Sequence, residues 1–281
     1  MFKNLFLILL LSSILIIFAL YFIYNSNIEN IENFEDSSYN IIFLTYNETS
    51  NFLLNDSDKY ITNMTDVDLY ARKVKSKKEY LEKISKNSIS FNIDEKKKLY
   101  ICAKNADNFL KNYNNIVNGN ELVLIKWKFA LVNNINDGDN IEYEEGLPHT
   151  REDIIFLSKY VLNNDNHSLT NILIHEKVHI YQRYNKDKIE KIINGYGYKV
   201  SDTTKNNKLI RANPDLNDKI YFDSKNNIEM IGLYKSYKPN GINDVILTNF
   251  SIEHPYEKMA YDIAEEYNKI HIKKYINNES L

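Results

Sequence analysis

LIHEKVHIYQR, residues 173–183, sets two histidines four positions apart with a glutamate directly after the first. Apolar residues recur at helical spacing through this stretch, from Leu169 and Ile172 to Ile180, and Ser168 offers a cap for the start of a helix. Residues four apart on a helix differ by only about 40° in direction and about 6 Å in height. The stretch therefore predicts two imidazoles on one helical face that can share one cation.

The chemistry of this spacing is that of metal-assisted hydrolysis. Glu176 is turned by about 100° from His175, which places its carboxylate beside an ion held by His175 and His179 rather than on it. Zn²⁺ with three protein ligands keeps one position open for water, lowers the pKa of that water toward about 7, and lets a nearby carboxylate take the proton. The alternative is a helix with two surface histidines. Apolar neighbours such as Val178 argue against a fully solvated face, so we predict zinc as the cofactor and Glu176 as the catalytic base.

The rest of the chain predicts an α+β fold. A capping-box-like start at Asn92–Glu95 predicts a helix over about 94–113, and alternation around Trp127 predicts a half-buried strand. The remaining predicted elements are a strand at 153–157, short strand-like runs at 219–222, 228–234 and 245–247, and a helix that opens at His254-Pro255 and runs to about 274.

Composition limits the possible functions. The formal net charge is -3, and no basic region predicts a nucleic-acid partner. Cys102 is the single cysteine, which excludes an intrachain disulfide and a Cys-rich metal site. A chain of 281 residues is long enough for one main domain and a separate leader. The sequence does not indicate an oligomeric state.

The N-terminal segment has the composition of a membrane span. Leu5 to Tyr24 carries no charge, and about 20 helical residues match the roughly 30 Å hydrocarbon core. A cleaved signal peptide is the alternative, but the apolar run is long and no small-x-small site follows it. We therefore expect a transmembrane anchor over residues 1–25, a polar stalk over 26–60 and the folded domain over 61–281. Lys3 before the span and acidic residues after it favour a single-pass protein whose C-terminal domain is lumenal, extracellular or on a virion surface.

The motif resembles that of the zincin metallopeptidases. The metzincin branch would continue the pattern with Gly and His where this chain has Gln182 and Asn185. The aspzincin branch would need an Asp that the Gly195–Tyr198 cluster lacks. The gluzincin-like branch takes a Glu from a second helix in a pattern resembling (N/H)-P-x-E-x-x-A, and residues 253–260, EHPYEKMA, fit it. This resemblance implies Glu257 as the third zinc ligand, with Glu253 and His254 as reserve candidates.

The resemblance covers the two helices and little else. Thermolysin-like members carry an Asp four places after the ligand Glu, where this chain has Tyr261, so the residues that orient the zinc histidines stay open. Residues 146–151, GLPHTR, and the motif helix also resemble uncharacterised HExxH proteins of large DNA viruses, a resemblance that assigns no activity.

Hydrolysis of an amide develops an oxyanion, which needs a hydrogen-bond donor nearby. The candidates are His149, Arg151, Tyr256 and Tyr261; we select His149 as a substrate or oxyanion contact, because the following strand would border the cleft in a zincin fold. The sequence thus predicts a membrane-anchored zinc metallopeptidase that acts on a peptide or protein. The alternatives are a zinc hydrolase with a non-peptide substrate and a non-catalytic, membrane-displayed structural or attachment protein on a zincin scaffold.

Overall fold

Strand β3 (Trp127–Val132) lies at the centre of the largest sheet. It runs parallel to β1 (Ile41–Phe43) on one side and to β5 (Ile154–Ser158) on the other. At the edge, β4 (His149–Arg151) pairs antiparallel with β5, and β2 (Ser88–Ile89) pairs antiparallel with the end of β3. Every residue of β5 is buried, as are all but one of β3, so both faces of this mixed sheet need a covering layer.

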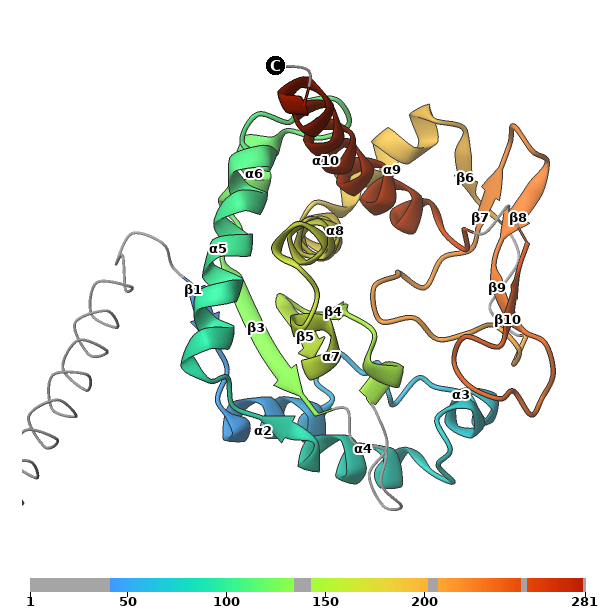
Figure 1. Ribbon diagram of the computed structural model, residues 1–281. Coiled ribbons are helices and arrows are strands. Elements are labelled where there is room, and N and C mark those ends of the chain that lie inside the picture. The colour runs from blue at the N-terminus through green and yellow to red at the C-terminus, as the bar shows by residue number, and fades with distance from the viewer. Residues whose placement is uncertain (1–40, 134–142, 202–206, 249–251, 280–281) are drawn as a thin grey trace, which may run out of the picture. The chain divides into compact units, whose positions relative to one another are not determined.

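The computed structural model describes residues 41–133, 143–201, 207–248 and 252–279, with side chains described as far as residue 270 (Figure 1). The structure is α+β with a small mixed sheet. Four short elements connect the larger ones: α3 (Asp66–Ala71), α6 (Gly119–Val123), η1 (Tyr143–Gly146) and α7 (Lys159–Leu162).

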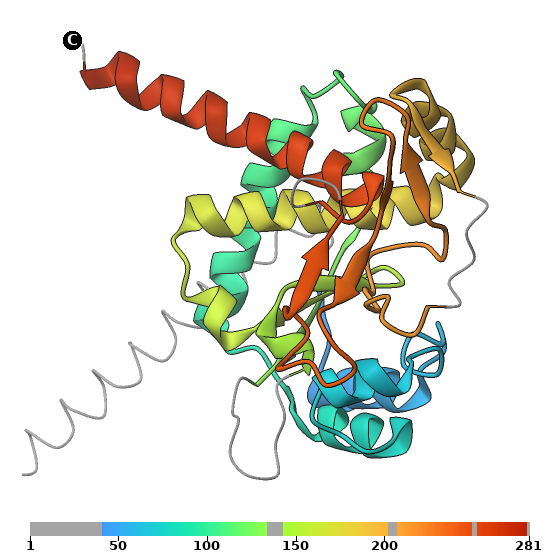
Figure 2. The ribbon, with the colours of Figure 1, turned by 90° about the vertical axis from the view of Figure 1, so that its right-hand side faces the viewer.

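Helices cover both faces of the sheet. On one face, α8 (Asn166–Tyr184) packs against α5 (Ile93–Leu110). Figures 1 and 2 show α10 (Pro255–Glu279) running along α8 on the side opposite the sheet. On the other face, α2 (Tyr46–Asn55) and α4 (Lys77–Lys86) bury an apolar cluster against β3 and β5. The motif helix α8 is therefore enclosed between the sheet, α5 and α10.

Side-chain caps fix where the main helices begin. The predicted capping box of Asn92 and Glu95 is present at the start of α5. For α8 the predicted cap is wrong by three positions: Asp165 is the cap, and its carboxylate accepts the backbone N–H of Ser168 at 3.0 Å. A carboxylate at this position satisfies a free N–H and also suits the positive end of the helix dipole.

A second group of strands lies between α8 and α10 in the chain. After α9 (Lys186–Gly195), the structure confirms strands in the predicted runs at 219–222, 228–234 and 245–247, divides the second run between two sheets, and adds a strand at 198–200, which was not predicted. These strands are β6 (Tyr198–Val200), β7 (Tyr221–Asp223) and β8 (Ile228–Met230) in a three-stranded antiparallel sheet, and β9 (Gly232–Tyr234) and β10 (Val245–Leu247) in a separate strand pair. A Cβ at Gly232 would lie 2.1 Å from Glu253 Oε2, so a larger residue at this position of β9 would require the Glu253 carboxylate to move.

The membrane part of the predicted architecture is corrected. A zincin-like domain behind a transmembrane helix requires a long apolar helix, yet none of the helices in residues 41–133, 143–201, 207–248 and 252–279 has both the length and the apolar character to cross a bilayer. The predicted span, Leu5–Tyr24, lies outside the described residues. The predictions of a transmembrane fold and of a single-pass protein with a lumenal, extracellular or virion-surface domain are therefore wrong for the part of the chain that the structure describes.

The predicted stalk also differs from the structure. Residues 41–60 contain β1, which pairs with β3, and α2, which packs on the core, so the folded unit begins at Ile41. The sequence carried a signal for α2, because Thr45 and Glu48 form a capping box. Residues 26–40 lie outside the described residues.

Candidate metal centre

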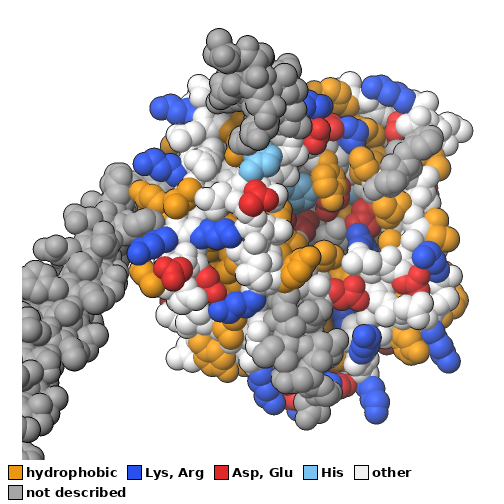
Figure 3. Space-filling view, in the orientation of Figure 1, with side chains coloured by type: hydrophobic (Ala, Val, Ile, Leu, Met, Phe, Trp, Pro, Cys, Tyr) orange, Lys and Arg blue, Asp and Glu red, His pale blue; other side chains and the backbone are white. Residues whose placement is uncertain are grey.

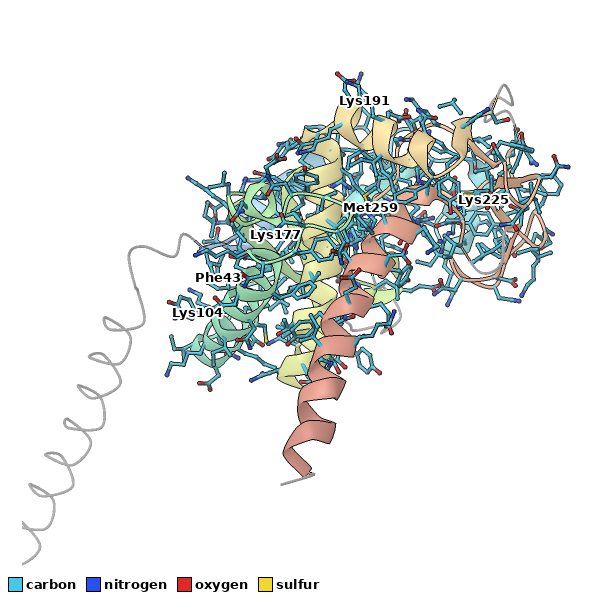
Figure 4. The ribbon with its side chains drawn as sticks, turned by 90° about the horizontal axis from the view of Figure 1, so that it is seen from above. Phe43, Lys104, Lys177, Lys191, Lys225 and Met259 are labelled. Atoms are coloured by element: carbon cyan, nitrogen blue, oxygen red, sulfur yellow. The ribbon has the colours of Figure 1, made fainter. Side chains whose placement is uncertain are left out.

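The motif face of α8 lies against the first turn of α10. His175 and His179 occupy successive turns of α8, and Glu257 follows Pro255 at the start of α10. Figure 4 shows the two helices side by side, with Met259 near the start of α10 and Lys177 on the side of α8 toward α5. The packing of two helices thus brings together side chains from distant parts of the chain.

Three ligand atoms converge at this contact. His175 Nε2 and His179 Nε2 are 3.0 Å apart, and Glu257 Oε2 lies 3.3 Å from the first and 3.7 Å from the second. A circle through these three atoms has a radius of about 1.9 Å, slightly less than the zinc–ligand distances of about 2.0–2.2 Å. Three ligand atoms this close together could hold one ion at those distances. Two imidazoles and a carboxylate are also ligands that zinc accepts, so these residues fit the ion.

Gln182 orients His179 for this role. The Gln182 amide donates its Nε2–H to the Tyr256 carbonyl at 3.0 Å, and that carbonyl can only accept. Gln182 Oε1 consequently faces His179 Nδ1 at 2.9 Å and accepts its proton. With the proton on Nδ1, the neutral ring carries a lone pair at Nε2, the atom directed at the other two ligand atoms.

Asn213 orients Glu257 in the same way. Its side-chain amide donates to Glu257 Oε1 at 3.2 Å, which leaves Oε2 toward the imidazoles, and also to Glu253 Oε1 at 2.7 Å. Glu257 is largely buried, with 9% of its surface exposed. Each of these two ligands is therefore held by a partner on its far side.

Burial and charge act against each other on these groups. Burial raises the pKa of Glu257, but the nearby imidazoles outweigh it and hold that pKa well below its ordinary value. Burial lowers the pKa of His179, but Glu257 and Asp215 outweigh it and raise that pKa to about 9. A cation that enters the centre therefore replaces a proton on His179.

Glu176 is a buried carboxyl group beside the centre. Its Oε2 atom is buried and has no hydrogen-bond partner among the described residues. Burial raises its pKa well above the ordinary value, and the carboxylates of Asp215 and Glu257 raise it further. A carboxylate with an unused acceptor atom and a raised pKa is suited to take up a proton.

The centre opens into a cavity of 460 Å³. Figure 3 shows histidine and acidic side chains in a hollow near the middle of this face. The cavity is lined by both polar and apolar residues. The polar ones are the motif residues with Arg211, Asn213, Asp215 and Glu253, and the apolar ones include Leu147, Pro148, Ile172, Ile242, Leu247 and Ile252. A volume in this range accommodates a small ligand or a few residues of a peptide.

His149 lines the cavity from β4, but its geometry does not suit the predicted oxyanion contact. Its Nδ1 lies 3.0 Å from the Leu147 carbonyl and donates to it, so Nε2 carries only a lone pair. Burial lowers the pKa of His149, which keeps the ring neutral. Nε2 is buried without a partner among the described residues. The ring can therefore accept a hydrogen bond at Nε2 and cannot donate one there.

Of the other oxyanion candidates, only Tyr261 lies at the cavity. Its ring contacts His175 edge-on at 4.5 Å between centroids, and 57% of its surface is exposed. Arg151 is fully buried elsewhere, paired with Asp56 at 2.6 Å. The Tyr256 hydroxyl donates to Glu190 at 3.4 Å, away from the centre.

The two reserve ligand candidates have other partners. His254 accepts the backbone N–H of Tyr256 at 3.1 Å, which is a capping contact at the start of α10. Glu253 pairs with Arg211 at the cavity wall. Neither belongs to the group of three converging ligand atoms.

The opposite face of the motif is also charged and buried. Lys177 is fully buried, donates to Asp107 Oδ1 at 2.7 Å and lies 4.0 Å from the centroid of the Trp127 ring. Trp127 Nε1 donates to the other oxygen of Asp107 at 2.9 Å. Burial lowers the pKa of Lys177 to about 8. These contacts tie α8 to α5 and β3 behind the histidines.

The sequence interpretation missed Gln182 and Asn213, the two orienting residues. Gln182 lies three positions after His179, within reach on the same helix face, so this signal was readable. Asn213 lies in a segment without helix or strand, and nothing in the local sequence indicated its role.

Comparisons with protein-family models, with curated proteins and with solved structures give no match. A functional interpretation depends on the geometry of this centre.

Proposed function

We propose that this protein is a zinc-dependent peptidase in which His175, His179 and Glu257 hold the ion and Glu176 is the general base. One observation carries the proposal: three ligand atoms lie close enough together to hold a single ion, beside a buried carboxylate oxygen that has no hydrogen-bond partner among the described residues. Zinc, when bound, supplies a Lewis acid that acidifies water and polarises a carbonyl group.

The proton transfers fall to Glu176. Its Oε2 takes a proton from the attacking water, and the same atom returns a proton to the amine that leaves. Burial raises its pKa, which supports the first step because a carboxylate with a raised pKa is a stronger base toward the proton of the water. No other side chain is needed to carry this proton.

Tyr261 is the donor that we assign to the developing oxyanion. It lies one turn after Glu257 on α10, at the cavity and against the His175 ring. Loss of a single donor of this kind typically lowers kcat about 10²- to 10³-fold. Tyr261→Phe is therefore expected to lower kcat by that factor while zinc content and KM stay near those of the unchanged protein, as steady-state kinetics on peptide mixtures would show.

The proposal is tested on the full chain by metal analysis and peptide hydrolysis together. We expect one zinc per chain, lost in His175→Ala, and hydrolysis that falls about 10²- to 10⁴-fold in Glu176→Gln with zinc retained. Glu265→Gln, an exposed glutamate on α10, is the matched control and should change neither quantity. A folded protein that takes up no zinc, or hydrolysis that persists in Glu176→Gln, would contradict the proposal.

A further inference from the structure

The outer edge of β4 is closed to a pairing strand. Thr150 directs its backbone groups away from β5: its N–H donates to Asp215 Oδ1 at 2.7 Å, and its carbonyl accepts from Arg183 Nη2 at 2.9 Å. Two residues further on, the Glu152 carbonyl accepts from Arg183 Nη1 at 3.1 Å. Two residues before Thr150 stands Pro148, which has no N–H to offer. Side chains of this protein thus occupy the positions that an added strand would use.

The segment from Arg211 to Asp215, here named the strap, lines the cavity next to β4 (Figure 1, the loop that extends toward β4). Asp215 holds one end of the strap to β4 through Thr150. Near its middle, Asn213 donates to Glu253 and Glu257 at the start of α10. The strap therefore spans from the sheet edge to the helix that carries the third ligand atom.

The strap is fixed along its length. The Arg211 N–H donates to the Gly232 carbonyl at 2.9 Å, and the Ala212 N–H donates to Asp68 Oδ1 at 2.9 Å. The Pro214 carbonyl accepts from Arg183 Nη2 at 2.7 Å. A segment whose backbone is bound at successive residues is a wall of the cavity rather than a moving cover.

We propose that the centre acts on short peptides and on chain ends that enter the cavity end-on, and not on the interior of an extended polypeptide. This inference rests on the proposed peptidase function and names its substrate class. The strap joins the edge of β4 to the start of α10 at this cavity. We therefore expect it to stand in the way of a long chain laid along that edge, where the amide groups of the chain would lose water without gaining partners. The 460 Å³ cavity holds the few residues nearest to an end.

The first test measures binding, so that it does not depend on turnover. Zinc-loaded Glu176→Gln, as the full chain, is titrated calorimetrically with the free tripeptide Ala-Leu-Ala, and with a 15-residue Gly/Ser peptide that carries the same three residues in its middle and blocked ends. Two further 15-residue peptides carry Ala-Leu-Ala at a free amino or a free carboxyl end. We expect the tripeptide and one of these two to bind at least about tenfold more tightly than the blocked peptide. Equal or tighter binding of the blocked peptide, or no binding by any peptide, would overturn the inference.

The second test opens the edge of β4. In the Glu176→Gln background, Asp215→Ala frees the Thr150 N–H, and we expect the blocked peptide to gain affinity. Asp215→Asn keeps an oxygen acceptor for that N–H and should leave the preference unchanged, as should Asp218→Ala, an exposed control outside the cavity. If Asp215→Ala is folded by circular dichroism but gains no affinity for the blocked peptide, the closed edge of β4 is not the cause of the preference for chain ends.

The two proposals fail in different ways. Mass spectrometry of products from an unfolded protein substrate should show residues released from one end by the unchanged protein and not by Glu176→Gln. Glu176-dependent cuts in the interior of the chain would overturn the end-on inference and leave the peptidase proposal intact. Binding of peptide ends without any Glu176-dependent hydrolysis would overturn the peptidase proposal and support the end-on binding mode.

Discussion

Two buried carboxylates in this protein have partners of opposite kinds. Glu144 is held by the Arg72 guanidinium through two hydrogen bonds, of 2.9 and 2.5 Å, and accepts a third from Tyr80 at 2.8 Å. Glu257 faces two imidazoles. Both groups have pKa values below the ordinary range. The first carboxylate has a permanent cation, whereas the second has partners that become cations only by taking up a proton.

This difference separates a structural ion pair from a binding site. A guanidinium stays charged at every accessible pH, so the Arg72–Glu144 pair needs nothing from outside the chain. An imidazole can lose its proton and then offers a lone pair. The site of Glu257 is thus complete either with a proton or with a metal ion, and only such a site can exchange one for the other.

The largest effect is expected at the permanent pair. Arg72→Met leaves the Glu144 carboxylate buried without its cation, which should lower the free energy of unfolding by about 3–5 kcal/mol. Lys78→Met removes an exposed partner of Glu82 and should change the free energy of unfolding by less than about 0.5 kcal/mol. Urea denaturation of both variants measures the two values. Similar losses in both variants would show that the buried pair contributes no more to the free energy of unfolding than the exposed pair.

The matching change at the other carboxylate should leave the zinc-free fold nearly intact. Glu257→Gln is expected to lower the stability of the zinc-free protein at pH 7 by less than Arg72→Met does, because His179 can lose its proton instead of staying charged and unpaired. It should abolish the zinc-dependent stabilisation, which for the unchanged protein is about 2.7 kcal/mol at 100 times Kd. Thermal unfolding with and without zinc checks both parts. A zinc-dependent shift that survives in Glu257→Gln would exclude Glu257 as a ligand.

A smaller effect on zinc binding is expected at Gln182, the hydrogen-bond partner of His179. Gln182→Ala removes the acceptor for the Nδ1 proton and should weaken zinc binding about 10- to 100-fold without removing a ligand. Gln182→Glu keeps an oxygen for that proton and should lose less affinity. Competition with a zinc chelator measures the zinc affinity of both variants and of the unchanged protein. Equal affinity of Gln182→Ala and the unchanged protein would mean that the ring needs no orienting partner.

The last expected effect, the smallest when taken per pH unit, is a pH dependence of zinc binding at the same site. The pKa of His179, raised to about 9 in the zinc-free protein, lies above its ordinary value, so the proton is bound at pH 7 and zinc must displace it. Zinc affinity should therefore rise about tenfold per pH unit up to about pH 9 and then level off. Calorimetry in buffers of different ionisation enthalpy should report release of about one proton at pH 7. Affinity that is constant from pH 7 to pH 9 would contradict this coupling.

Local signals in the sequence were enough for the helices of the centre. The spacing of His175 and His179 is a property of one helix, and Pro255 marks the start of the helix that carries Glu257. The identities of the three converging residues could therefore be named in advance. The predicted strands at 153–157 and 245–247 followed from apolar runs in the same way.

What the sequence could not supply depends on contacts between distant segments. The role of His149 turns on a proton that the Leu147 carbonyl fixes, and no spacing rule reports a tautomer. The strap has no apolar periodicity, because its position comes from side chains such as Asp68 and Arg183 in other parts of the chain. The pair of Arg72 with Glu144 joins residues that only the folded chain brings together. Tertiary contacts of this kind override local pattern.

The Lys177 contact ties the third letter of HEKVH to a residue far upstream. Because an ammonium group enclosed by α5 and β3 is tolerable only with Asp107 beside it, neither residue can be exchanged alone without stranding a charge. We therefore expect these two positions to vary together: related chains should keep both or replace both by apolar residues of similar size. A substitution at Asp107, about 70 positions before the motif, would in this way shift the helix that carries the histidines without changing the histidines themselves.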